Sequence, residues 1–240
     1  MTPIKLKLPR SVPLPFWARH HSFAHHGLVI FLVQIGLLTL VPILDDGKPL
    51  MPLPYTVAVL AGSSFTIFCL GYRRLAATFA TAGTIGLAVV ASMPHHDQVI
   101  RFPTMLVLLI AYGLSVYLAI YQAFAGDLTS AQRILCGAAS FVMIGFVFAV
   151  AHGLVHYIHP DSYTLATQAE QLRTRRWLDF LWLSFSTLTT AGFNDVIPVT
   201  PWPCTLATLE GLCGILFPAT LIARIASLPP GKKSGSSHAP

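Results

Sequence analysis

Long uncharged apolar segments follow one another along most of this chain, and they constrain its fold more than any other feature. Only 10% of the residues are charged and 54% are hydrophobic, whereas about a quarter of the residues in a soluble domain are charged. Crossing about 30 Å of hydrocarbon takes roughly 20 apolar residues of helix. Six segments meet this requirement, and the sequence therefore predicts an all-α membrane protein. They are residues 27–44, 54–72, 75–93, 103–124, 134–158 and 202–222.

The Lys and Arg residues between these segments indicate how the chain is oriented. Basic residues close to membrane segments stay on the cytoplasmic side. In a six-span arrangement, ten Lys and Arg residues fall on one side of the membrane and five on the other. We therefore expect a multi-pass plasma-membrane protein, of the kind found in a bacterial inner membrane, with both termini in the cytoplasm. The net charge of +6 follows from this topology and from contact with anionic lipids, so we expect no nucleic-acid partner.

A shorter apolar stretch, L-W-L-S-F-S-T-L-T-T-A-G-F-N-D, lies at residues 181–195, between the last two spanning segments. It is too short to cross a bilayer. Its hydroxyl-rich middle and Gly-aromatic-Asn-Asp end fit a re-entrant pore helix followed by an extended loop, because irregular backbone is tolerated at membrane depth where it lines a cavity. A cation that crosses the membrane needs oxygen dipoles in place of its hydration shell, and rings of backbone carbonyls supply them. The ordinary alternative is a Thr- and Gly-rich turn between two membrane helices.

Residues 189–195, T-T-A-G-F-N-D, resemble the T-T-V-G-Y-G-D selectivity filter of tetrameric potassium channels. The resemblance covers roughly residues 134–227, including V-I-P-V-T-P after the filter and A-R in the last apolar segment. It implies a tetrameric pore domain at 131–227, made of an outer helix, a pore helix, the filter and an inner helix. It also implies that four residues bind potassium through backbone carbonyls, with the Thr190 hydroxyl forming the innermost ring. These residues are Thr190, Ala191, Gly192 and Phe193.

The filter of such a channel needs a backbone that alternates between right- and left-handed regions. Positive φ costs Gly little, and Gly192 fits this requirement. Asn194 stands where the family usually has a second Gly; Asn is among the few other residues that tolerate the left-handed region, so the loop can still form. Because of Asn194, a weakly selective monovalent cation channel is an alternative to a potassium-selective one.

The resemblance also assigns residues that support the filter. Phe193 replaces the usual Tyr and lacks the hydroxyl that would anchor the filter to the pore helix. Trp182 matches a position whose indole donates to the carboxylate after the filter, so the resemblance implies a Trp182–Asp195 hydrogen bond. The supporting residues are Trp182, Ser186, Thr189 and Asp195.

The segment at 202–222 is the expected inner, pore-lining helix. Gly214 falls at the family's hinge glycine, and Pro218, one turn further, should bend the helix; together they form the expected gate, and close helix packing is the alternative for Gly214. Glu210 is the only carboxylate in a proposed span, where it needs water or a partner. It lines the cavity or lies behind the filter, bonded to pore-helix hydroxyls such as that of Ser186. We favour the second position.

The rest of the chain lies outside the resemblance to the pore. Residues 27–126 are expected to form a four-helix bundle in the place of a voltage sensor, but the segment at 103–124 lacks the repeated Arg or Lys that sensing requires. Residues 1–26 form a cytoplasmic N-terminal segment, and 228–240 a disordered tail. Within the expected outer helix of the pore, His152 and His156 are four residues apart, a spacing that suits zinc or proton sensing. We favour hydrogen bonding within the protein.

These features predict a passive, potassium-channel-like homotetramer that is surrounded by membrane lipids. No cofactor is expected apart from the permeant potassium ions. A non-conducting scaffold or sensor subunit that has kept the pore fold is the alternative from another class. An enzyme is not expected, because Thr189 and Thr190 have no His or carboxylate at a spacing that suggests an activated nucleophile.

Overall fold

The computed structural model of the chain describes residues 23–44, 53–69, 72–92, 97–125, 130–165 and 177–227. Within these ranges the chain is mostly helical. The α-helices are α1 (Phe23–Leu44), α2 (Leu53–Cys69), α3 (Arg73–Ser92), α4 (Asp97–Ala125), α5 (Ser130–Ile158), α6 (Trp177–Leu188) and α7 (Pro201–Ala226). A 3-10 turn (Pro160–Ser162) and the short strands β1 (Tyr163–Leu165) and β2 (Val196–Pro198) lie close to α6 in the sequence.

The six apolar segments predicted from the sequence correspond to α1–α5 and α7, and their ends differ by a few residues. Three helical segments are long and apolar enough to cross a membrane: Met105–Phe124, Ser130–Ile158 and Pro201–Ala226. Two shorter apolar helical segments lie at Gly27–Leu40 and Val57–Cys69. The chain is thus a mostly helical membrane protein with three candidate spanning helices among its described residues. Six crossings remain a prediction.

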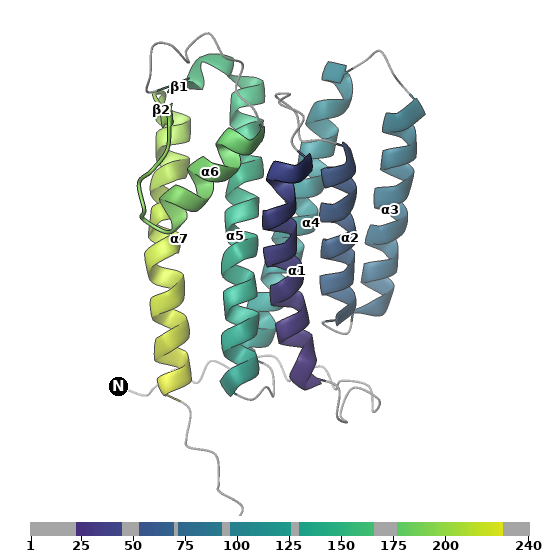
Figure 1. Cartoon of the computed structure of the whole chain (residues 1–240), viewed down its shortest axis with the longest axis vertical. Helices are drawn as coiled ribbons and strands as arrows, with labels where there is room; N and C mark the ends of the chain where they lie inside the picture. The colour runs from purple at the N-terminus through teal and green to yellow at the C-terminus, as the bar shows by residue number, and fades with distance from the viewer. Residues whose placement is uncertain are drawn as a thin grey trace, which may run out of the picture.

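Helix α5 is the centre of the arrangement. It packs against α1, α4, α6 and α7, and Figure 1 shows α6 and α7 on one side of it and α2, α3 and α4 on the other. Small residues let these neighbours approach closely: a Cβ at Gly137 would overlap the Leu221 side chain of α7, and one at Gly145 would come within 2.7 Å of the Phe185 ring of α6. The side chains of Tyr112 and Phe146 stack between α4 and α5, with ring centroids 5.4 Å apart.

Helix α6 is inclined between α5 and α7, and the loop after it returns to the end of the molecule from which α6 descends (Figure 1). This is the course expected of a re-entrant pore helix. The antiparallel pairing of β1 and β2, with Thr164 opposite Ile197, ties the returning chain to the segment that follows α5. This pairing was not predicted, because each strand has only three residues.

Several predictions concern residues outside the described ranges. They include most of the N-terminal segment at 1–26, the part of the loop before α6 at 166–176, and the tail at 228–240. These predictions, and the division of the chain into a four-helix bundle at 27–126 and a pore domain at 131–227, stay predictions.

Candidate functional site

The loop that follows α6 is held against the end of that helix by its own amide groups. The backbone N–H groups of Ala191 and Gly192 both donate to the carbonyl oxygen of Ser186, at 2.9 and 3.3 Å. The N–H of Thr190 donates to the carbonyl oxygen of Thr187 at 3.1 Å. The bonds between α6 and the loop therefore use backbone N–H groups of the loop, and they leave its backbone carbonyl oxygens without a partner from α6.

The carbonyl oxygens of Thr190, Ala191, Gly192 and Phe193 accept no hydrogen bond from the part of the chain that the structure describes. All four residues are exposed in the single chain. Backbone carbonyls at membrane depth need partners, and a cation stripped of its water is such a partner. A row of consecutive unbonded carbonyls is the feature that this kind of ion site requires.

The backbone of the loop alternates in hand over part of its length. Thr190 has φ 57° and Gly192 has φ 72°, and no other described residue from 189 to 195 has positive φ. Positive φ is expected at Gly192. It is a marked departure for Thr190, because a β-branched residue in the left-handed region costs about 1–3 kcal/mol and such strain concentrates at functional sites.

Asn194 does not adopt the left-handed backbone that its residue type tolerates. Instead its side-chain Oδ1 accepts a hydrogen bond from the N–H of Val196, at 3.1 Å. This local turn is a common use of Asn. The alternation of backbone hand therefore ends before Asn194.

The expected side-chain support of the filter differs from what the structure shows. No hydrogen bond joins Trp182 to Asp195 in this single chain, although both residues are described, and the Trp182 side chain is 53% exposed. The expected bond between them is therefore wrong for the isolated subunit. Ser186 contacts the loop through its carbonyl oxygen rather than its hydroxyl, and the Thr189 hydroxyl donates to the Phe185 carbonyl oxygen of its own helix, at 2.6 Å.

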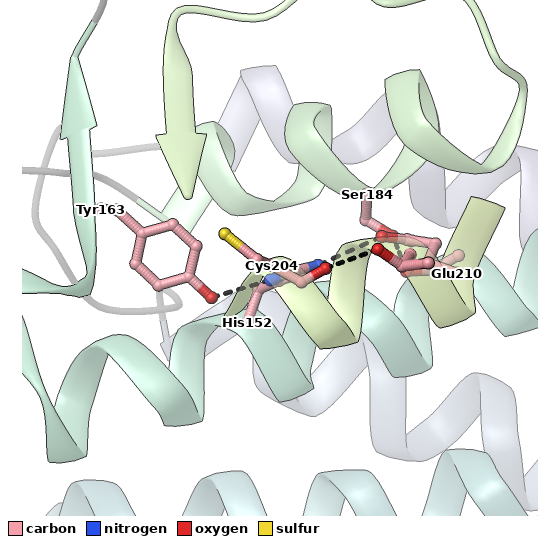
Figure 2. Close-up of polar contacts among 7 residues, drawn as sticks. His152, Tyr163, Ser184, Cys204 and Glu210 are labelled. Atoms are coloured by element: carbon pink, nitrogen blue, oxygen red, sulfur yellow. Dashed lines mark hydrogen bonds and ion pairs between the residues drawn. The ribbon is translucent and has the colours of Figure 1, made fainter. Parts of the chain in front are cut away.

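Glu210 lies against α6, where a row of buried polar side chains joins several elements. Its Oε1 contacts the hydroxyl of Ser184 on α6, and its Oε2 lies 3.1 Å from Nε2 of His152 on α5. Nδ1 of His152 lies 2.7 Å from the hydroxyl oxygen of Tyr163 in β1. Figure 2 shows these four side chains in sequence. Glu210 thus contacts a hydroxyl of α6, as the favoured position requires, but that hydroxyl belongs to Ser184 and not to Ser186; its position relative to a filter stays a prediction.

The surroundings of this row keep it dry and fixed. The side chains of His152, Ser184 and Glu210 are fully buried, and that of Tyr163 is 1% exposed. Burial raises the pKa of the Tyr163 phenol above its ordinary value, so the phenol keeps its proton. The prediction that His152 hydrogen-bonds within the protein is confirmed. The described residues contain no group of three or more His, Cys, Asp or Glu that could hold a metal ion.

The two expected gate residues both lie inside α7. A Cβ at Gly214 would overlap the carbonyl oxygen of Leu188, the last residue of α6. This contact supports the packing alternative for Gly214, and its role as a hinge stays a prediction. Helix α7 continues through Pro218 to Ala226.

The sequence did not indicate Ser184, His152 and Tyr163 as partners of Glu210. Ser184 is one of several hydroxyls along the pore helix, and Tyr163 belongs to a loop with no pattern of its own. The usable signal was that the segments at 134–158 and 202–222 have almost no ionisable residues, yet the first contains His152 and the second contains Glu210. Polar residues in neighbouring membrane helices usually pair with each other.

A family model described as "Ion channel" matches residues 153–229, which is less than half of the chain. The matched region begins within α5 and includes α6, the loop and α7. This match supports an ion-channel pore in the second half of the chain. No curated protein and no solved structure matched the chain.

Proposed function

We propose that this chain is the subunit of a potassium-channel-like protein that conducts cations passively through a central pore. The observation that carries this function is the row of unbonded carbonyls at Thr190, Ala191, Gly192 and Phe193, within the region that matches an ion-channel model. Potassium ions bind to these oxygens in place of water. The conducting role of the loop leaves no need for an enzymatic one.

One chain supplies one filter loop, and a ring of four is needed to surround an ion. The proposed assembly is a homotetramer in the plasma membrane, in which the pore domain at 131–227 surrounds the axis. Apolar side chains exposed on α7 in the single chain support this assembly: Trp202 is 74%, Ile222 67% and Ile215 60% exposed. In a tetramer, such side chains meet neighbouring subunits or line the inner pore.

Potassium flux into liposomes that contain the purified protein tests this function. We expect concentration-dependent flux from the wild type and a loss of at least about tenfold in Gly192→Ala, because an L side chain at φ 72° costs roughly 1–2 kcal/mol and distorts the loop. Gly36→Ala is the matched control, since a Cβ there meets nothing within 4 Å and its φ is not positive. Equal flux from Gly192→Ala and Gly36→Ala would show that the pore lies elsewhere.

A weakly selective monovalent cation channel is the second candidate. The φ and side-chain bond of Asn194 favour it, because the alternating backbone ends one residue short of the family's pattern. In mixed sodium and potassium, we then expect a reversal potential between those of the two ions, and Asn194→Gly should move it toward that of potassium. A wild-type reversal potential already at the potassium value would exclude weak selectivity.

A further inference from the structure

The hydroxyl of Ser184 has one proton and two close oxygen neighbours on different helices. Its Oγ lies 2.7 Å from the carbonyl oxygen of Gly145 on α5 and also contacts Oε1 of Glu210 on α7. Oxygen atoms approach this closely only with a proton between them. A carbonyl oxygen has no proton to give, so the Ser184 proton lies on the line to Gly145. The contact between Ser184 and Glu210 therefore needs a proton from Glu210.

We propose that Glu210 is a neutral carboxylic acid that donates to Ser184 and completes a one-way chain of four hydrogen bonds. The remaining directions follow from this assignment. Since Oε2 of Glu210 is then an acceptor, Nε2 of His152 carries a proton and donates to it, at 3.1 Å. Neutral His152 accepts at Nδ1 from the Tyr163 hydroxyl, at 2.7 Å. The chain runs from Tyr163 through His152, Glu210 and Ser184 to the Gly145 carbonyl oxygen (Figure 2).

The surroundings of Glu210 agree with a neutral side chain. A fully buried carboxylate needs a charged partner, since burying an unpaired charge costs far more than burying a neutral group. Among the described residues, no Lys or Arg pairs with Glu210, and its only ion-pair candidate is His152. The other titratable side chains close to this row are Cys213 on α7, Cys204 near Tyr163, and His156, whose ring centroid lies 6.1 Å from that of Tyr163. Neither cysteine supplies a positive charge, and His156 contacts Tyr163 rather than Glu210.

The hydrogen-bonded chain ties the pore helix to both flanking helices. Ser184 on α6 is linked through Gly145 to α5 and through Glu210 to α7, and Tyr163 extends the chain to β1. The Trp182–Asp195 bond is absent from this subunit, so the buried chain provides the side-chain support that the filter lacks in front. Glu210 is thus a positioning residue, and this part of the inference rests on the proposed function.

Difference infrared spectroscopy of the full-length protein in lipid tests the protonation directly. We expect the carbonyl band of a protonated carboxylic acid at neutral pH, lost in Glu210→Gln and retained in Asp179→Asn, which alters another buried carboxyl group on α6. A spectrum in which Glu210→Gln removes only the bands of an ionised carboxylate would overturn the proposal. If Glu210→Gln does not fold, Ser184→Ala should shift the wild-type acid band by removing its acceptor, and an unshifted band would equally contradict it.

Flux measurements on three variants test the positioning role. Gln has an N–H to donate to Ser184 and an oxygen to accept from His152, as the neutral acid does, so Glu210→Gln should keep the wild-type flux. Glu210→Ala leaves buried groups unpaired, and we expect a loss of about tenfold. Ser140→Ala is the control, since the Ser140 hydroxyl is buried but bonds only within α5, to the Cys136 carbonyl oxygen. Flux that falls equally in Glu210→Gln and Glu210→Ala would contradict the neutral form.

The infrared and flux experiments separate two kinds of failure. The acid band without flux would support the neutral Glu210 and contradict the proposed channel function. Flux without the acid band would support the channel function and contradict the neutral Glu210.

Discussion

Gly214 brings the backbone of α7 into contact with the last residue of the pore helix, and its missing side chain makes that contact possible. We expect Gly214→Ala to lower the free energy of unfolding by about 1–3 kcal/mol, the usual cost of overpacking, because the added Cβ overlaps the backbone oxygen of Leu188. Thermal unfolding of the purified protein in detergent measures this loss. Gly211→Ala lies one turn earlier on the same helix and meets nothing within 4 Å, so its melting temperature should stay close to that of the wild type.

The backbone of Gly192 was predictable because positive φ depends on residue type. Gly192 has the positive φ that its position in the motif requires. Asn194 was harder to predict, because Asn either adopts left-handed backbone or bonds to a nearby amide through its side chain, and the sequence does not decide between them. Ser184 and Ser186 both carry a hydroxyl group on α6, and the sequence does not show which of them contacts Glu210. The packing of α6 against α5 and α7 shows that it is Ser184.

Among the helices, two arginines connect the end of α4 to α5 and α7. Arg133 at the start of α5 is buried and donates to the carbonyl oxygens of Ala123 and Phe124, at 2.8 and 3.4 Å. Arg224 near the end of α7 reaches the same Phe124 oxygen at 3.4 Å. Helix ends have carbonyls without intrahelical partners, and cations stabilise them. These contacts link the end of α4 to the start of α5 and the end of α7.

We expect Arg133→Ala to destabilise the protein by roughly 1.5–3 kcal/mol, since a charged donor is removed from buried carbonyls. Chemical denaturation of the protein in mixed micelles measures the effect. Arg74→Ala is the matched control, because Arg74 on α3 is exposed and an exposed substitution changes stability by about 0.5 kcal/mol or less. Equal stability of the two variants would show that Arg133 does not hold the end of α4.

The helices themselves were predictable from apolar length alone, since the described α1–α5 and α7 contain most of the residues of the six predicted segments. Which helices pack against each other could not be predicted, because apolar helix faces in a membrane do not select their partners by hydrophobicity. The pairing of β1 and β2 depends on three residues in each strand, which is too few for a sequence pattern to indicate.

A single chain would leave the proposed ion site incomplete. The loop from Thr190 to Phe193 is exposed, and α7 presents exposed apolar side chains along most of its length. The proposed tetramer covers the loop on one side and brings its carbonyls around an axis. Native mass spectrometry from detergent micelles should therefore give four times the 26.0 kDa subunit mass, and a mass equal to one subunit would remove the basis of the pore.

A structure of the full-length protein in lipid nanodiscs, determined once in potassium and once in sodium, tests the proposed pore most directly. We expect four copies around one axis, with ion density between the carbonyl oxygens of residues 190–193 in potassium. A single subunit in the disc, or a four-fold ring without ion density at these oxygens in either salt, would contradict it.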